Sequence, residues 1–182
     1  VTFIVVATIA SGIRLATPFL LASLGEALGQ RSGGLNLGVD GVMLIGAFGA
    51  YYTVLKTNNL YYGLMFGILL GLLMGVLYAF ITIHLRAEQG VSGIGIYLFG
   101  LGMSDLLFQK LVGTPRPILP FMPVDIPYLS QIPILGEMLF QHSPIVYLAF
   151  GLVPIMGFIL KRTNYGLNVR AIGENPEAAD SL

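Results

Sequence analysis

The chain has 182 residues, of which 55% are hydrophobic and 10% are charged, and its formal net charge is zero. Soluble domains carry about 25% charged residues, so this composition excludes an ordinary water-soluble domain and indicates an integral membrane protein. The balanced charge offers no basic surface for nucleic acid, and without cysteine these residues contain no disulfide and no thiolate metal site.

Five apolar segments are long enough to be membrane helices, which need about 20 apolar residues. Their apolar runs are continuous and do not alternate with a period of two, so we expect helices and not strands. In chain order the segments are Thr2–Leu28, Leu35–Leu55, Tyr62–Leu85, Val91–Val112 and Pro144–Leu160. The predicted fold is therefore all-α and polytopic, with the lipid bilayer as its solvent.

The first segment contains Arg14 and Pro18, and an ionisable residue inside a membrane segment suggests a function. Two other interpretations stay open: Arg14 lies at a junction between two shorter pieces, or its long side chain reaches the interface.

A glycine-rich stretch, SGGLNLGVDG at residues 32–41, precedes the second segment. Glycine permits an unwound backbone, which membranes tolerate only where protein or water covers it, and transporters place such breaks near their substrate. The alternative is an ordinary loop in which Asp40 interacts with the dipole of the following helix. The sequence does not decide between a broken helix and a loop.

Gly63, Gly67, Gly71 and Gly75 recur every four residues in the third segment and so share one helix face. Small residues in a row let two helix backbones approach closely in lipid. This pattern predicts that the glycine face packs against a neighbouring helix.

The fourth segment has polar residues at both ends. The stretch AEQGVSGIG opens it, while Asp105 and Gln109 lie one turn apart near its other end. These two side chains either line a path or simply meet water and Lys110 at the interface.

The proline-rich connection 113–143 is expected to be an ordered, non-helical hairpin or cap, with a short surface helix near 134–141. Lys and Arg favour the cytoplasmic side of a membrane protein. The orientation that best fits this rule places the tail after Leu160 inside and the connection outside. The connection 113–143 is either a plain connector or part of a docking surface for an extracytoplasmic partner.

The C-terminal stretch YGLNVRAIGENPEAADSL is polar, unlike the rest of the chain. Asn175 is a good helix N-cap and Pro176 suits the first helical position, so a short helix should start there. A preceding helix from about Leu167 to Ile172 should end at Gly173, because glycine adopts the left-handed conformation of a helix stop.

No catalytic motif is present: the sequence lacks a P-loop, an HExxH pattern and a GxSxG elbow. We therefore expect no enzymatic activity, no catalytic residue, no metal and no cofactor in this chain.

Four stretches, in the same order, resemble importer-type ABC permeases of the branch that includes simple-sugar, ribose-type and nucleoside permeases. They are RLATPFLLASLGEALGQRSGGLNLGVDGVMLIGAFGA, EQGVSGIGIYLFGLG, PVDIPYLSQIPILGEMLF and TNYGLNVRAIGENPEAAD, and together they cover nearly the whole chain. The resemblance implies the N-terminal part of a single permease domain, residues 1–182, within a larger helical bundle. It also implies that 113–143 is extracytoplasmic and that 161–182 is the cytoplasmic loop that inserts into the ATPase subunit.

The resemblance also assigns residues to two candidate sites. The ATPase-coupling residues would be Gly166, Arg170, Gly173, Glu174, Asn175, Pro176, Ala178 and Ala179. The translocation path would involve Asn36, Gly38, Asp40, Gly41, Ser92, Gly93 and Phe99.

The resemblance implies an ATP-driven importer for a nucleoside or a simple sugar in the plasma (inner) membrane. Its partners would be an ABC ATPase subunit, which hydrolyses the ATP, a second permease subunit and an extracytoplasmic solute-binding protein. Two alternatives stay open. One is an ion-coupled secondary transporter or channel that uses Arg14, Asp40 or Asp105. The other is a non-transporting membrane scaffold held together by the glycine face.

Overall fold

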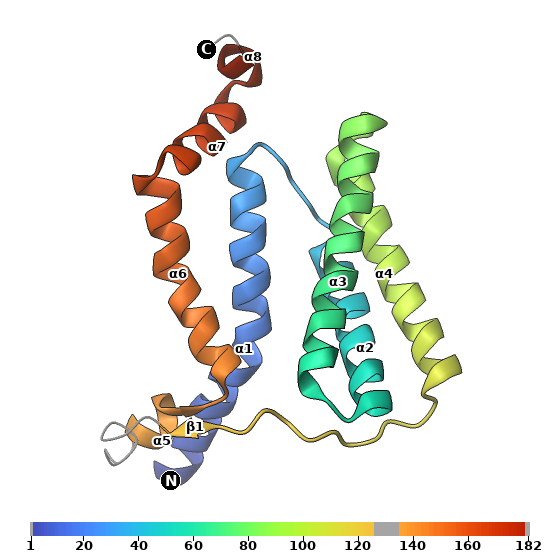
Figure 1. Cartoon of the computed structure of the whole chain (residues 1–182), viewed down its shortest axis with the longest axis vertical. Coiled ribbons are helices and arrows are strands. Elements are labelled where there is room, and N and C mark those ends of the chain that lie inside the picture. Colours follow the sequence, from blue (N-terminus) through green and yellow to red (C-terminus); the bar gives the residue numbers. More distant parts are fainter. Residues whose placement is uncertain (1, 126–134, 181–182) are drawn as a thin grey trace. The chain divides into compact units, whose positions relative to one another are not determined.

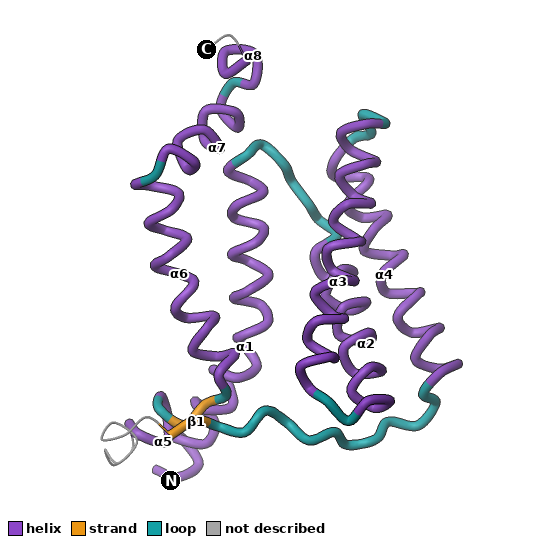
Figure 2. The backbone as a smooth tube through the Cα atoms, viewed as in Figure 1, coloured by secondary structure: helices purple, strands orange, loops and turns teal. Residues whose placement is uncertain are grey.

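The structure is a computed structural model that describes residues 2–125 and 135–180, and helices dominate it (Figures 1 and 2). The long helices are α1 (Thr2–Arg31), α2 (Val39–Thr57), α3 (Leu60–Ala79), α4 (Gln89–Leu111) and α6 (Pro144–Arg162). A π-helical turn, η1 (Phe80–His84), extends α3. The short elements are β1 (Val124–Asp125), α5 (Leu135–Leu139), β2 (Gln141–His142), α7 (Asn164–Glu174) and α8 (Pro176–Asp180).

The prediction of an all-α, polytopic fold is confirmed, since each of the five predicted segments overlaps one long helix. By length and composition four helices in the described residues can cross a membrane: α1, α3 with η1, α4 and α6. The second predicted segment differs most, because α2 begins at Val39 and not at Leu35. The residues between α1 and α2 are not helical.

Helix α1 runs without a break through Arg14 and Pro18, so the proposed junction between two shorter pieces is not found. Proline has no backbone N–H, so Pro18 cannot donate to the carbonyl of Arg14, one turn earlier. Next to it, Thr17 is buried and its hydroxyl donates to the carbonyl of Ile13 at 2.8 Å. The guanidinium of Arg14 donates to the Ser11 hydroxyl on the same helix at 3.2 Å.

The chain divides into two compact units, of which the first comprises Val1–Gly33 and Phe121–Leu182. In this unit α1 contacts α5, α6 and α7. Strand β1 pairs antiparallel with β2, with Val124 opposite His142. The His142 side chain is buried, and its Nε2 lies 3.0 Å from the carbonyl oxygen of Met138. The expected hairpin in 113–143 is thus present at β1 and β2, and α5 lies within the predicted surface helix, of which residue 134 is outside the described residues.

The second unit, Gly34–Pro120, is built on α2, which packs against both α3 and α4. Its buried core contains Ile45, Met74 and Ile96, one residue from each helix. The glycine face of α3 lies against α2 at one end: a Cβ atom at Gly67 would be 3.1 Å from the carbonyl oxygen of Gly46. At Gly75 no atom lies within 4 Å of such a Cβ atom. The predicted close packing of this face is therefore confirmed over its first half.

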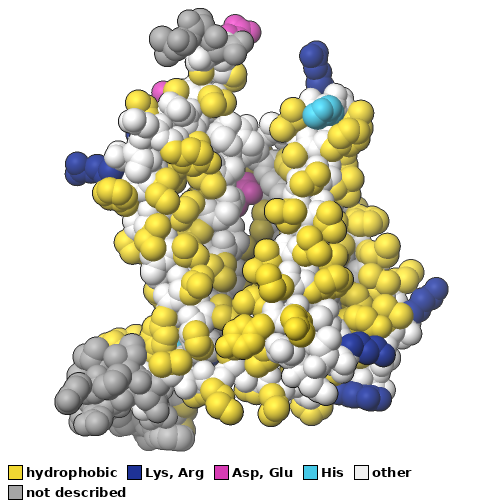
Figure 3. Space-filling model, viewed as in Figure 1, with side chains coloured by type: hydrophobic (Ala, Val, Ile, Leu, Met, Phe, Trp, Pro, Cys, Tyr) yellow, Lys and Arg dark blue, Asp and Glu magenta, His cyan; other side chains and the backbone are white. Residues whose placement is uncertain are grey.

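Apolar side chains cover the visible surface of the helices, whereas the visible Lys and Arg side chains lie at helix ends (Figure 3). On α3, for example, Met65, Ile68 and Leu72 are each more than 60% exposed. Such a surface is unfavourable in water and favourable in lipid or against other membrane helices.

Candidate functional site

The C-terminal segment α7–α8 begins at a tight turn after α6. Thr163 leaves the helical conformation, its hydroxyl accepts from the backbone N–H of Gly166 at 3.2 Å, and it donates to the Ile159 carbonyl at 2.6 Å. Gly166 is buried, and a Cβ atom there would overlap the carbonyl oxygen of Ile159. The absence of a side chain at Gly166 thus allows α7 to fold back onto the end of α6.

Gly173 does not stop a helix, contrary to the sequence prediction. Helix α7 continues through it to Glu174. A Cβ atom at Gly173 would overlap the carbonyl oxygen of Arg31 and lie 3.1 Å from the backbone nitrogen of Gly33. The glycine is required by this close contact with the end of α1, and not by a left-handed backbone. Gly33 itself has a φ of +86°, where glycine is favoured.

The start of α8 agrees with the prediction, since the helix begins at Pro176 and follows Asn175 directly. Glu174, Asn175 and Pro176 are exposed, whereas Ala179 is half-buried. Arg170 turns back along α7, where its Nε donates to the Gly166 carbonyl at 3.2 Å. Ala178 lies within α8. The segment therefore presents its exposed polar residues around the α7–α8 bend.

Side chains from α3 and α4 hold the loop between α1 and α2. Leu35 donates its N–H to the side-chain oxygen of Gln89 at 2.8 Å, and its carbonyl accepts from the hydroxyl of Tyr78. Asn36 closes a turn by accepting from the N–H of Gly38 at 2.8 Å. The loop is thus a non-helical segment that two side chains of the following helices hold by hydrogen bonds, while Leu35 and Leu37 stay exposed.

The glycines predicted on the translocation path lie at the contact between α2 and α4. A Cβ atom at Gly38 would be 2.7 Å from the carbonyl oxygen of Gly93, and one at Gly93 would be 2.7 Å from the nitrogen of Leu37. Further along, a Cβ atom at Gly100 would overlap the carbonyl oxygen of Gly41. These glycines let the two helix backbones touch.

The other predicted path residues do not join this contact. Asp40 is exposed in the first turn of α2, and Phe99 is 47% exposed on α4. The hydroxyl of Ser92 donates to the carbonyl of Glu88 at 2.6 Å. Tyr78 and Gln89 were missed as site residues, because only the fold shows that they hold a loop more than 40 residues earlier in the chain.

Glu88 caps the N-terminus of α4. Its carboxylate accepts from the backbone N–H of Val91 and from that of Gly90, the latter at 2.8 Å. Both hydrogen bonds lower the pKa of Glu88 from its ordinary value, and the one from Val91 has the larger effect. Among the described residues no group of three or more His, Cys, Asp or Glu could hold a metal ion.

Comparison with known proteins gives a match to one family model, described as branched-chain amino acid transport system / permease component, over residues 8–182. Three curated relatives carry names of ABC permeases. The putative glucose ABC transporter permease protein TsgC13 of Haloferax volcanii is 37% identical over 175 residues, which are 93% of this chain and 52% of that protein. The guanosine ABC transporter permease protein NupQ of Bacillus subtilis is 35% identical over 184 residues, which are 92% of this chain and 56% of that protein.

The nucleoside ABC transporter permease protein NupC of Lactococcus lactis is 31% identical over 185 residues, which are 96% of this chain and 58% of that protein. The chain thus spans somewhat more than half the length of these relatives. No solved structure matches it significantly.

Proposed function

Because the chain belongs to the family of branched-chain amino acid transport system permease components, we propose that the protein is the membrane subunit of an ATP-driven importer for a nucleoside or a simple sugar. The observation that carries this proposal is the match of residues 8–182 to the family, together with relatives named as glucose, guanosine and nucleoside permeases. The chain is a multi-pass component of the plasma (inner) membrane.

We propose a nucleoside or sugar and not an amino acid as the solute, although the family description names amino acids. The relatives at 31–37% identity are named for a sugar or for nucleosides. Only 10% of the chain is charged, so few ionised groups can pair with the two charges of an amino acid. A neutral solute with many hydrogen-bonding groups suits such a path better.

The segment α7–α8 is the proposed contact with the ATPase subunit, on which ATP would be hydrolysed. Its support is the family resemblance and the exposure of Glu174, Asn175 and Pro176 at the bend. Gly166 and Gly173 would act differently, because both face backbone of this chain. They would hold the segment in position, while the exposed residues would contact the ATPase.

In the proposed cycle, ATP binding closes the ATPase subunits and displaces α7–α8. Gly173 lies against Arg31 and Gly33, so this displacement reaches the end of α1 and the turn at Gly33. Switching of the helices between outward and inward access would follow. A second permease subunit would complete the membrane part, and a solute-binding protein would dock on the extracytoplasmic connection 113–143.

The first test is co-purification of the full-length protein with its ATPase from native membranes, with Glu174→Lys as the variant. Glu174 is exposed, so reversing its charge changes the docking surface while the fold stays intact. Lys110→Glu, an equally large charge change at the exposed end of α4, is the matched control. We expect wild type and control to retain the ATPase and Glu174→Lys to lose it.

If no ATPase accompanies the wild type in several mild detergents, the importer proposal is wrong. Uptake that survives ATP depletion and collapses with the ion gradient would identify an ion-coupled transporter instead. The solute class needs a separate competition assay in proteoliposomes that contain all subunits. Competition by charged amino acids, with none by nucleosides or sugars, would contradict a neutral solute.

A further inference from the structure

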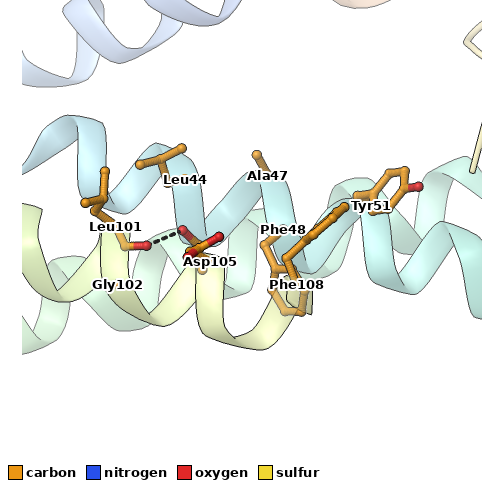
Figure 4. Close-up of a pocket in the computed structure, with 9 residues that line it drawn as sticks. Leu44, Ala47, Phe48, Tyr51, Leu101, Gly102, Asp105 and Phe108 are labelled. Atoms are coloured by element: carbon orange, nitrogen blue, oxygen red, sulfur yellow. Dashed lines mark hydrogen bonds between the residues drawn. The ribbon is translucent and has the colours of Figure 1, made fainter. Parts of the chain in front are cut away.

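A groove between α2 and α4, with a volume of about 630 Å³, contains one carboxylate among apolar and aromatic side chains. Figure 4 shows Asp105 between Leu44 and Leu101 on one side and Phe48 and Phe108 on the other. Small-molecule sites typically have volumes of about 300–1,000 Å³, mostly apolar walls and a few polar groups. The groove therefore has the size and composition of a ligand site.

Asp105 keeps hydrogen-bonding capacity for a ligand. Gln109 donates to its Oδ2 at 2.8 Å, and within the described residues this is the only hydrogen bond of the carboxylate and no cation pairs with it. Ionised carboxylates only accept hydrogen bonds, so Oδ1 is available to a donor. Hydroxyl groups are donors of this kind.

The position of Asp105 argues against lipid as the occupant. It lies six residues before the end of α4 at Leu111, which corresponds to about 9 Å along the helix. A carboxylate inside a membrane span normally faces a bundle interior or a water-filled cavity. Acyl chains would leave its Oδ1 without a donor, whereas a solute with hydroxyl groups would supply one.

The aromatic wall of the groove is held in place before any ligand binds. Tyr51 and Phe108 stack with their ring centroids 5.9 Å apart. The hydroxyl of Tyr51 donates to the carbonyl of Arg116 at 2.7 Å and accepts from its N–H at 2.8 Å. A fixed aromatic surface loses little entropy when a flat ring or the apolar face of a sugar packs on it.

We propose that this groove is a binding site for the transported solute, with Asp105 accepting hydrogen bonds from vicinal hydroxyl groups and the aromatic wall packing against the ring. The proposal rests on the function proposed above and names the recognised chemistry: a ring with adjacent hydroxyl groups. Simple sugars and the ribose of nucleosides share this feature. The nucleoside would add a base for the aromatic wall.

The test uses the full-length protein with its partner subunits in proteoliposomes, with Asp105→Asn and Phe48→Leu as variants. Charge-assisted hydrogen bonds are about twice as strong as neutral ones, so Asp105→Asn should lower uptake at subsaturating solute by about tenfold or more. Glu26→Gln is the matched control, because Gln30 donates to Glu26 at 3.1 Å in the same one-turn arrangement on α1. Phe48→Leu should reduce guanosine uptake more than glucose uptake.

Protection from a thiol reagent separates binding from a structural effect. Leu44 lines the groove and Leu72 lies exposed on α3, so a cysteine at each, in a background without other cysteines, reports the two surfaces. Solute should slow labelling of Leu44→Cys and leave Leu72→Cys unchanged. Normal uptake by Asp105→Asn and Phe48→Leu, with no protection at Leu44→Cys, would overturn the site while the ATPase still co-purifies. Loss of that co-purification instead marks the failure of the importer proposal.

Discussion

Two glycines of α4, Gly95 and Gly100, have opposite surroundings. A Cβ atom at Gly100 would overlap the backbone carbonyl of Gly41, whereas at Gly95 it would meet nothing within 4 Å. Gly100→Ala should therefore force α2 and α4 apart and destabilise the protein by about 1–3 kcal/mol. Gly95→Ala should be neutral or stabilise by about 0.5–1 kcal/mol, since alanine favours a helix. Thermal unfolding of the full-length protein in one detergent compares the two, and equal melting temperatures would contradict the close packing.

The cap at Glu88 makes a contribution to stability that depends on pH. Its pKa is lowered in the folded protein by the N–H groups of Val91 and Gly90. A carboxylate with a lowered pKa stabilises the fold above its unfolded pKa, which is about 4.3 for Glu, and this contribution is lost as pH falls through the folded value. Glu88→Gln should thus lower the melting temperature at pH 7, and the difference from wild type should shrink below about pH 4. A difference that stays constant with pH would show that the charge of the cap has no effect.

At the scale of the elements, the backbone of α7 at Gly173 lies directly against the backbone at the end of α1. Gly173→Ala would place a methyl group against the Arg31 carbonyl and push the two helices apart. If α7–α8 is the coupling segment, this variant should keep the ATPase bound while solute uptake per ATP hydrolysed falls severalfold. Gly29→Ala, near the end of α1 and with nothing within 4 Å of the new atom, should behave like wild type. Measurement of uptake and hydrolysis in the same proteoliposomes decides this, and an unchanged ratio in Gly173→Ala would exclude coupling through this contact.

The ends of the helices can be predicted where residues close in sequence determine them. Pro144 starts α6 as predicted, and an apolar run of sufficient length predicts α4 to within two residues. Gly173 was misread because glycine serves two purposes, a left-handed backbone or a close approach. The choice between them depends on Arg31, which lies far away in the sequence.

At the scale of the whole molecule, the membrane class and the family could be predicted, because composition and four ordered motifs extend along nearly the entire chain. The groove at Asp105 could not be predicted from the sequence. The sequence places Asp105 one turn from Gln109 and near Phe108, but Phe48 and Tyr51 on the facing side come from α2, more than 50 residues earlier. A local pattern shows which groups lie on one helix and does not show which helix packs next to it.

The loop before α2 has a consequence for how the protein is made. Leu35 is held by groups that lie 43 and 54 residues later in the chain, on Tyr78 and Gln89. During synthesis the loop leaves the ribosome before either partner exists, so the N–H and C=O groups of Leu35 must stay hydrated until the start of α4 arrives. The loop therefore reaches its final conformation late in membrane insertion. The connection between α1 and α2 is thus completed only after α3 and the first residue of α4 have been synthesised.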